Sequence, residues 1–381
     1  MTSSTILSTW NEMALLDLVT IKSGQVDPRA PAYRNLPLIA PDHLASQTGR
    51  LLKKESAAAQ GAISGKYLVK PGDVIYSKIR PYLQKAYKCD FDALCSADMY
   101  PFTPRPGVDA SFVLHTILGS DFTNFATSVS ARSGIPKINR AELSEYRLTV
   151  PPSREQRAIG RALDDVDDLI AALERMIAKK QAIKHGVMQQ LLTGTTRLPG
   201  FTERWELRRL GDLLAYEQPG RYLVSSTEYG DVGTPVLTAG KTFVLGRTTE
   251  RHGIYYSVPV IIFDDFTTAS KFVTFPFKAK SSAMKILSAR SGVNLHYMYE
   301  RMQLIDYPVV DHKRRWIAEY SKIEVEVPDD AEQRAIASVI DDAGAEVNAL
   351  EVRIAKARAI KAGMMQELLT GSTRLPVEAA S

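Results

Sequence analysis

Residues 155–199 read EQRAIGRALDDVDDLIAALERMIAKKQAIKHGVMQQLLTGTTRLP, and residues 332–376 read EQRAIASVIDDAGAEVNALEVRIAKARAIKAGMMQELLTGSTRLP. The two stretches align at one constant offset without a gap and are identical at 27 of their 45 positions. An internal repeat sets the architecture of a chain, because each copy forms the same structural unit. The remaining sequence is therefore read as the segments that surround two copies of one element.

Apolar residues recur every three or four positions in both copies, which is the spacing of one helical face in a heptad pattern. This seam consists of Ile159, Leu163, Val166, Ile170, Leu173, Ile177, Ile336, Ile340, Ala343, Val347, Leu350 and Ile354. Each copy follows a proline and stops at a glycine, Gly194 or Gly371. The pattern predicts two long helices over about 154–192 and 331–369. Because a helix with one apolar stripe needs a partner, we expect the copies to pack as an antiparallel coiled coil.

The helical copies divide the chain into four parts: a first domain (1–150), a first helical spacer (151–199), a second domain (200–327), and a second spacer with the C-terminal tail (328–381). Both domains are rich in Gly, Pro, aromatic and β-branched residues, which predicts an α+β fold. They also begin alike, since Trp10, Leu15, Asp17 and Leu18 match Trp205, Leu210, Asp212 and Leu213. We therefore expect a pseudo-twofold repeat, in which nearly invariant helices accept two identical partners and divergent domains accept two different ligands.

Length and composition favour a soluble protein of two or three domains, with 381 residues of which 45% are hydrophobic and 24% charged. No apolar run approaches the roughly 18 residues of a membrane span, and the N-terminus lacks a basic region followed by an apolar one. We expect a cytoplasmic protein in which Cys89 and Cys95 are reduced thiols. The formal charge of +5 permits a nucleic-acid partner without demanding one.

No motif of a catalytic, nucleotide-binding or metal-binding class occurs in the sequence. GAISGK at 61–66 has the wrong spacing for a phosphate-binding loop, and no HExxH exists. We therefore expect no catalytic residue, metal or cofactor in this chain. Asp264 and Asp265, the best acidic candidates, are expected to cap the turn at the end of a strand. The aspartates within 164–168 and 341–342 are expected to form a solvated or partner-facing surface.

Both domains contain Lys and Arg clustered among aromatic and hydroxyl side chains, within runs bounded by Gly and Pro. Arg and Lys bond phosphates and guanine, and Ser and Thr contact backbone or bases, so such runs suit loops that reach a DNA groove. The candidates for DNA contact are Lys78, Arg80, Lys137, Arg140, Lys271, Lys285, Arg314 and Arg315.

Over essentially its whole length the chain resembles the specificity subunits of type I restriction-modification systems. The resemblance rests on VPPSREQRAI with GVMQQLLTGTTRLPGF, on their second copies VPDDAEQRAI and GMMQELLTGSTRLP, and on GKYLVKPGDVIYSKIRPYL and PVIIFDDFTTASKF. It implies two target-recognition domains that each read one half of a bipartite, asymmetric site in double-stranded DNA. It also implies helices that set the spacing and bind two methyltransferase subunits, with restriction subunits in the full complex. S-adenosylmethionine, ATP and Mg are expected on those partner subunits.

Two other classes of function stay open at the level of sequence. A self-contained DNA methyltransferase or nuclease would need a catalytic motif, and the sequence contains none that we can identify. A scaffold without DNA affinity would use the coiled coil only to space two binding modules. A salt-sensitive shift of duplex DNA separates that scaffold from a DNA-binding subunit.

Overall fold

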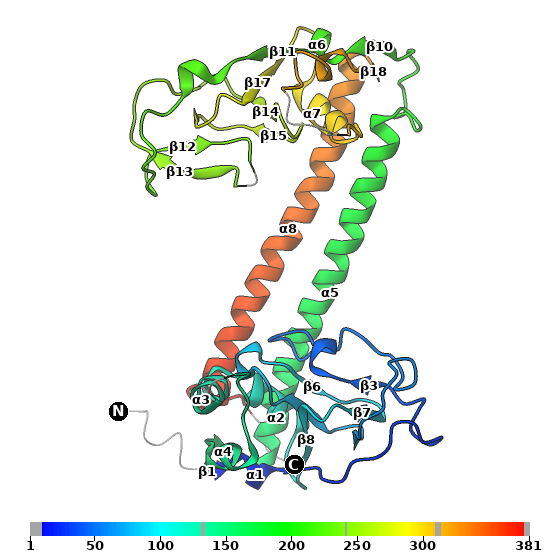
Figure 1. Cartoon of the computed structure of the whole chain (residues 1–381), viewed down its shortest axis with the longest axis vertical. Coiled ribbons are helices and arrows are strands. Elements are labelled where there is room, and N and C mark those ends of the chain that lie inside the picture. The colour runs from blue at the N-terminus through cyan, green and yellow to red at the C-terminus, as the bar shows by residue number, and fades with distance from the viewer. Residues whose placement is uncertain (1–9, 131–133, 241, 309–313, 377–381) are drawn as a thin grey trace. The chain divides into compact units, whose positions relative to one another are not determined.

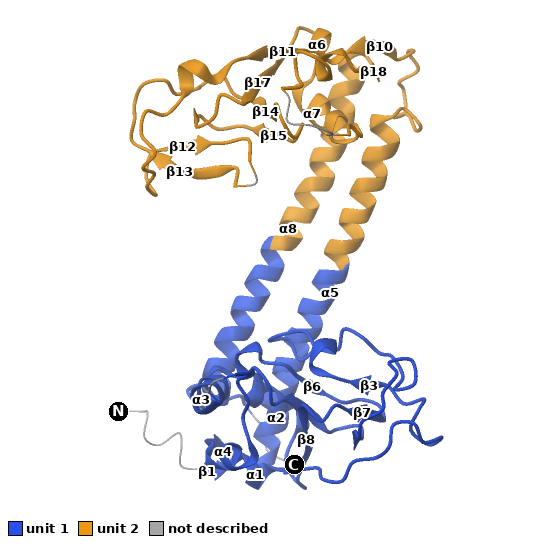
Figure 2. Ribbon diagram, viewed as in Figure 1, with its two compact units in different colours: residues 1–175, 352–381 blue, residues 176–351 orange. Residues whose placement is uncertain are grey.

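The computed structural model describes residues 10–130, 134–240, 242–308 and 314–376. The chain divides into two compact units, shown in different colours in Figure 2. Unit 1 comprises residues 1–175 and 352–381, and unit 2 comprises residues 176–351. Each unit therefore contains one α+β domain together with parts of both long helices.

The two repeated stretches form helices α5 (Ser153–Leu192) and α8 (Asp330–Leu369), each of 40 residues (Figure 1). The predicted helices are confirmed, with starts one residue earlier than expected. Gly194 and Gly371 follow the helix ends with φ of 72° and 75°, the left-handed conformation in which glycine ends a helix without steric cost. None of the described helices combines the length and apolar character that a membrane crossing requires.

The predicted seam faces inward along both helices. Nine of its twelve residues are buried, and Val166, Ile177 and Ala343 are partly buried.

Ion pairs beside the seam give the direction of the two helices within each unit. In unit 1, Asp167 pairs with Lys361 at 2.6 Å and Glu174 pairs with Arg358 at 2.8 Å. Moving forward along α5 therefore means moving backward along α8. In unit 2, Lys180 pairs with Glu346 at 2.5 Å, and the Lys184 ammonium lies beside Gly344. Both units thus contain an antiparallel helix pair, as the heptad pattern predicts.

The domain of unit 1, hereafter the first domain (residues 10–150), combines three small sheets with short helices. Its strands are β1 (Asn11–Ala14) paired with β9 (Arg147–Val150), a four-stranded sheet in the order β2 (Val19–Ile21), β8 (Met99–Pro104), β5 (Val74–Ser77), β6 (Ala86–Lys88), and a three-stranded sheet in the order β3 (Leu38–Ile39), β7 (Ala93–Cys95), β4 (Tyr67–Val69). Its α-helices are α1 (Leu15–Leu18), α2 (Ala110–Leu118), α3 (Ser120–Ser130) and α4 (Arg140–Glu145), and its 3-10 helices are η2 (Pro41–His43) and η3 (Pro81–Leu83).

The domain of unit 2, hereafter the second domain (residues 205–327), also has a two-stranded, a four-stranded and a three-stranded sheet, and its four-stranded sheet has the same order of strands as that of the first domain. Its strands are β10 (Glu206–Arg209) paired with β18 (Glu324–Val327), a four-stranded sheet in the order β11 (Leu214–Glu217), β17 (Met284–Ala289), β14 (Val260–Asp264), β15 (Ser270–Val273), and a three-stranded sheet in the order β13 (Val244–Thr248), β12 (Thr234–Leu237), β16 (Lys278–Ala279). Its helices are α6 (Leu210–Leu213), α7 (Leu295–Gln303), η4 (Pro219–Tyr222) and η5 (Tyr320–Lys322).

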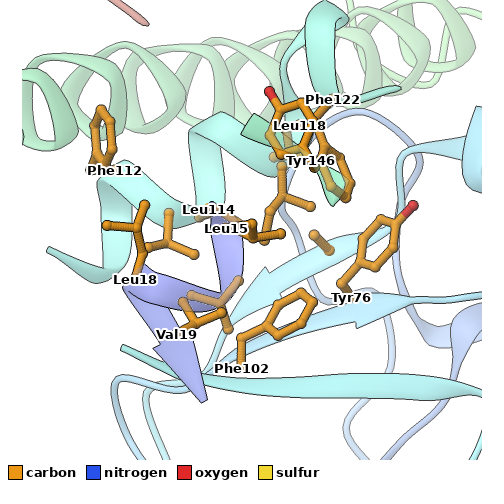
Figure 3. Packing of buried hydrophobic residues seen from close by; sticks show 14 of the residues in the cluster. Leu15, Leu18, Val19, Tyr76, Phe102, Phe112, Leu114, Leu118, Phe122 and Tyr146 are labelled. Carbon is orange, nitrogen blue, oxygen red and sulfur yellow. The ribbon is translucent and has the colours of Figure 1, made fainter. Parts of the chain in front are cut away.

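Aromatic and aliphatic side chains fill the core of the first domain (Figure 3). Tyr76 from β5 is 1% exposed and packs edge-on against Phe122 from α3, with ring centroids 5.2 Å apart. Ile159 and Leu163 of α5 and Leu368 of α8 belong to the same cluster. The long helices are therefore part of the domain core, and burial of this apolar surface stabilises the helices and the domain together.

A glutamine at the start of each long helix attaches that helix to its domain. Gln156 accepts a hydrogen bond from the backbone N–H of Asp109 at 3.1 Å, and Gln333 accepts one from the N–H of Asn294 at 2.8 Å. Asp109 and Asn294 are the N-cap residues of α2 and α7. The glutamine of the repeated EQ dipeptide therefore binds the equivalent helix start in both domains. This shared contact explains why the residue is the same in the two copies.

Candidate nucleic-acid interface

The first basic cluster lies where β5 ends. The backbone N–H of Lys78 donates to Asp98 O at 3.1 Å, and its carbonyl accepts from Ile138 N–H at 3.0 Å. Arg80 N–H donates to Pro136 O at 2.8 Å, and Ile79 forms a bridge with Lys137. The segment after β5 is thus joined to the segment before α4. This pairing brings three predicted contact residues, Lys78, Arg80 and Lys137, into one place.

Like charges face one another in this cluster. Burial lowers the pKa of Lys78, and the cations of Lys137 and Arg140 lower it further, while the Asp98 carboxylate acts in the opposite direction. Lys78 is partly buried, with its ammonium 5.3 Å from the centre of the Tyr100 ring. Lys137 and Arg140 are exposed. Among the described residues none of these three cations forms an ion pair, so the cluster is suited to an external anion or hydrogen-bond acceptor.

The second domain places different chemistry at the same position. Phe263 of β14 pairs with Lys285 of β17, as Tyr76 of β5 pairs with Tyr100 of β8. The residue after β14 is Asp265, whose Oδ2 lies 2.9 Å from the Lys285 ammonium, and each side chain is 1% exposed. An internal ion pair therefore occupies the position that Lys78 and Tyr100 occupy in the first domain.

Two predicted DNA contacts are corrected by this arrangement. Lys285 is buried against Asp265 and also donates to Gln218 at 3.1 Å, so its charge is used inside the domain. Arg315 is 4% exposed, and its side chain donates to Phe266 O at 3.3 Å. A side chain that is buried and already hydrogen-bonded cannot also contact a DNA groove. We therefore no longer propose Lys285 and Arg315 as residues that contact DNA directly.

Lys271 and Arg314 are the two remaining candidates in the second domain, and both are exposed. Lys271 lies on β15, opposite Ile262 of β14. Arg314 immediately precedes Arg315, whose N–H donates to Asp265 Oδ1 at 3.0 Å. The buried aspartate thus fixes the backbone beside an exposed arginine. Residues 309–313 of the same basic run lie outside the described residues.

Asp264 caps the turn after β14, as the sequence predicts. Its carboxylate accepts from Phe266 N–H at 2.9 Å and from Thr267 Oγ1 at 2.6 Å. Thr268 then adopts a left-handed φ of 61° before the chain enters β15. The two acidic neighbours thus have separate structural functions, one in the turn and one in the buried ion pair. No group of three or more His, Cys, Asp and Glu side chains among the described residues could hold a metal ion.

The prediction of a solvated aspartate surface is corrected at Asp164 and Asp167, whose side chains are partly buried against the protein. Asp164 accepts from His115 Nε2 at 2.9 Å, from Lys88 Nζ at 2.7 Å and from Ser111 Oγ at 2.6 Å. Burial acts to raise the pKa of Asp164, but these hydrogen bonds outweigh it and hold that pKa well below its usual range.

Two further helical aspartates, the partly buried Asp167 and the exposed Asp341, also have partners. Asp167 pairs with Lys361, and Asp341 pairs with His296 at 3.1 Å. Asp165, Asp168, Asp341 and Asp342 are exposed, so the prediction of a solvated surface holds for these four positions.

Tyr100 and Asp98 belong to the cluster, although the sequence analysis did not single them out. Tyr100 lies on β8 and donates from its hydroxyl to Ile138 O at 3.3 Å. Burial raises the pKa of its phenol, and the Arg140 cation acts against that increase. Only the pairing of β5 with β8 brings Tyr100 next to Lys78, so no local pattern could have identified it.

The chain is similar to known proteins both in sequence and in fold. Residues 8–185 match a protein family described as the type I restriction modification DNA specificity domain. The chain is 51% identical over 133 residues to the EcoR124I/EcoR124II specificity subunit of Escherichia coli, a match that covers 32% of this chain and 33% of that one. It is 31% identical over 219 residues to the E. coli EcoDI specificity subunit, which covers 58% of this chain and 48% of the relative. The matches thus span between one third and one half of these relatives.

Solved structures share the fold of the whole chain. The HsdS subunit from Thermoanaerobacter tengcongensis aligns with a TM-score of 0.52 and 16% identity, covering 96% of this chain and 98% of that one. The S subunit of a type I restriction-modification system from M. genitalium aligns with a TM-score of 0.61 and 14% identity, covering 94% and 96%. At these identities the likeness concerns the fold alone. Two α+β domains joined by two long helices are therefore an arrangement known from solved proteins.

Proposed function

We propose that this chain is a specificity subunit of a type I restriction-modification system, the DNA-recognition subunit of such a complex; the family match over residues 8–185 and the similarity to two E. coli specificity subunits support this. Each domain reads one half of a bipartite site in double-stranded DNA. The chain has no catalytic function of its own in this proposal. S-adenosylmethionine, ATP and Mg act on the partner subunits, and the complex works in the cytoplasm, where it meets DNA.

One observation carries this proposal: the four-stranded sheets of the two domains have the same strand order, yet they place different side chains at the same strand end. Lys78 follows β5 in the first domain, and Asp265 follows β14 in the second. Sequence-specific readers differ in the side chains that reach base edges, because each base pair presents its own pattern of donors and acceptors. A repeated sheet that presents Lys78 at this strand end in one domain and buries the Asp265–Lys285 ion pair there in the other suits a site whose two halves are read by different side chains.

The helices support the proposal of two identical partners. Ile183 on α5 and Ile360 on α8 occupy equivalent positions of the repeat and are 47% and 48% exposed. Lys179 and Lys356 are a second identical pair, and both are exposed. Packing does not require identity at exposed positions, whereas binding of two copies of one protein does. We assign these surfaces to the methyltransferase subunits, with restriction subunits joining the full complex.

An exchange of domains tests the proposal. Residues 203–325 are replaced by the corresponding segment of a relative, and the hybrid is expressed with methyltransferase subunits. Methylation sequencing should then show one half of the methylated motif altered and the other half intact. A hybrid in which both halves of the methylated motif change would contradict the proposal. So would a wild-type complex whose methylated motif is not bipartite. Failure of the wild-type complex to shift duplex DNA in a salt-sensitive way would favour a scaffold without DNA affinity.

The spacing function of the helices has its own test. Four residues inserted after Gln181 add about 6 Å and about 400° of helical rotation, so the seam stays nearly in phase. Duplex DNA rises about 3.4 Å per base pair, and the unread gap should lengthen by one or two base pairs while both half-site sequences persist. Insertion of two residues rotates the stripe by about 200° and should abolish assembly. An assembled four-residue variant that methylates only the original gap would refute the spacing function.

A further inference from the structure

We propose that Lys78 reads a guanine in the half-site of the first domain, while Lys137 and Arg140 bind the adjoining phosphates. This inference rests on the proposed function and adds a division of labour within the basic cluster. It assigns one residue to base recognition and two residues to the sequence-independent part of the affinity.

The backbone of Lys78 is fixed more firmly than that of an ordinary loop residue. Its N–H and its C=O are both hydrogen-bonded, to Asp98 and Ile138. Two residues earlier, the buried Tyr76 ring anchors β5 in the core, where it packs against Phe122 (Figure 3). A residue that discriminates between bases must be held in a defined position, and an element attached to the core provides that position better than a free loop.

The Tyr100 ring restrains the Lys78 side chain, which suits a single contact with a base. Its ammonium lies 5.3 Å from the centre of the Tyr100 ring, a favourable cation–π arrangement. The Tyr100 hydroxyl is itself tied to Ile138 O at 3.3 Å. By contrast, Lys137 is exposed and Arg140 is an exposed residue of the first turn of α4. Arg140 also donates to Lys22 O at 3.3 Å, which leaves the rest of its guanidinium exposed. A restrained side chain suits base recognition, and exposed cations beside it suit the phosphates.

The electrostatics of the cluster call for an acceptor. Lys78 forms no ion pair with any described residue, and it lies in the field of two further cations. An ammonium group has three donors and no acceptor, so it matches an edge that presents acceptors alone. In the major groove guanine offers the two acceptors N7 and O6, whereas adenine offers one acceptor and one donor. Guanine is therefore the base that fits Lys78 best.

In the second domain, the residue that corresponds to Lys78 is Asp265, and it has a structural function instead of a DNA contact. There Asp265 and Lys285 neutralise each other, and Asp265 also accepts from the N–H groups of Arg315 and Trp316. The Lys285 ammonium therefore has both its charge and its hydrogen bonds engaged within the domain. The contrast indicates that the strand-end position reads DNA in the first domain and stabilises the fold in the second.

The test uses the complete chain assembled with methyltransferase subunits, and methylation sequencing as the readout. Lys78→Met, which keeps the length of the side chain and removes its charge, should relax a single guanine position in one half-site. The expected loss of discrimination is about 5- to 150-fold. Lys137→Met is the matched control, and it should weaken binding evenly across sequences and reduce the salt slope by about 1. Lys78→Gln should shift the preference toward adenine, because Gln presents one donor and one acceptor.

An unchanged motif in a folded Lys78→Met complex would overturn the inference. If that variant failed to fold, retention of strict guanine by Lys78→Gln would overturn it equally. Relaxation of a position in both half-sites would also contradict it, because the other half is assigned to the second domain. A wild-type complex that methylates no bipartite motif would instead refute the proposed function.

Discussion

The Arg374 guanidinium donates from Nε to Glu155 Oε1 at 2.7 Å, which joins the C-terminal segment to the start of α5 across 219 residues of sequence. Glu155 is buried and also accepts from Trp10 Nε1 at 3.0 Å. The second unit repeats this clasp, because Arg197 donates to Glu332 at 2.6 Å. The TRLP motif that follows each helix therefore closes on the glutamate of the other copy.

Glu155→Gln should destabilise unit 1 by about 1.5–3 kcal/mol, the usual contribution of hydrogen bonds to charged groups. The substitution leaves the Arg374 cation with a neutral amide, so the clasp loses its charge complementarity. Hydrogen–deuterium exchange should show faster exchange at the start of α5 and little change in unit 2. Glu145→Gln, an exposed glutamate of α4, serves as control and should change stability by less than about 0.5 kcal/mol. Equal hydrogen–deuterium exchange at the start of α5 in the wild type and in Glu155→Gln would show that this ion pair does not stabilise the helix start.

Leu163→Ala should cost about 2–5 kcal/mol, because Leu163 is fully buried between α5 and the first domain. Leu169→Ala is a matched control on the same helix, since Leu169 is about half exposed and should cost far less. Chemical denaturation of the two variants makes the comparison. Similar losses of stability would show that the seam does not face the core.

Asp164→Asn should destabilise unit 1 by about 1–3 kcal/mol at pH 7, since His115, Lys88 and Ser111 lose a charged acceptor. The folded protein holds the pKa of Asp164 below its ordinary 3.8, so the carboxylate stabilises the fold above that value. This contribution disappears as the pH falls from about 3.8 toward the lower folded pKa. The stability difference between wild type and variant should therefore shrink below pH about 3.8.

Asp165→Asn is the control for that pH dependence, because Asp165 is an exposed neighbour on the same helix. Its effect on stability should stay within about 0.5 kcal/mol at neutral and acidic pH. Denaturation at pH 7, 5 and 3 gives the comparison. A difference for Asp164→Asn that grows on acidification would have the wrong sign for this account.

Lys285→Met should destabilise unit 2 by about 3–5 kcal/mol, because Asp265 would remain as a buried charge without its partner. Lys271→Met, at an exposed position of β15, should leave stability nearly unchanged and lower DNA affinity with a smaller salt slope. Denaturation and salt-dependent DNA binding distinguish the two variants. A stable Lys285→Met protein with altered sequence preference would restore Lys285 as a contact residue.

Ile183→Asp and Ile360→Asp should each remove one of two identical partner subunits, and the double variant should remove both. Leu169→Asp is the control, because Leu169 is equally exposed but has Glu346 at the equivalent position of the repeat. Native mass spectrometry of the assembled complex counts the subunits. Loss of both partners from a single Ile variant, or from Leu169→Asp, would contradict two repeated binding surfaces.

The sequence by itself determined the two helices and the antiparallel seam, because both follow from local periodicity. The residues from Ile159 to Ile177 mark one face of a helix wherever that helix lies, and Gly194 marks its end. The repeat and the shared start of the domains also predicted two similar α+β bodies. The proposed function also began with the motifs of the repeat, since those motifs carry the resemblance to type I specificity subunits.

Only the tertiary structure decided which of the basic residues proposed as DNA contacts are exposed and which are buried in ion pairs. Lys78 and Lys285 both lie in basic runs of similar composition, yet β14 and β17 place Lys285 against Asp265, while β5 and β8 place Lys78 against Tyr100. Strand pairing joins residues about twenty positions apart, and no local pattern of charge specifies that pairing. A charge that is buried without a partner costs much free energy, so a buried lysine such as Lys285 stays in its ion pair and has a structural function.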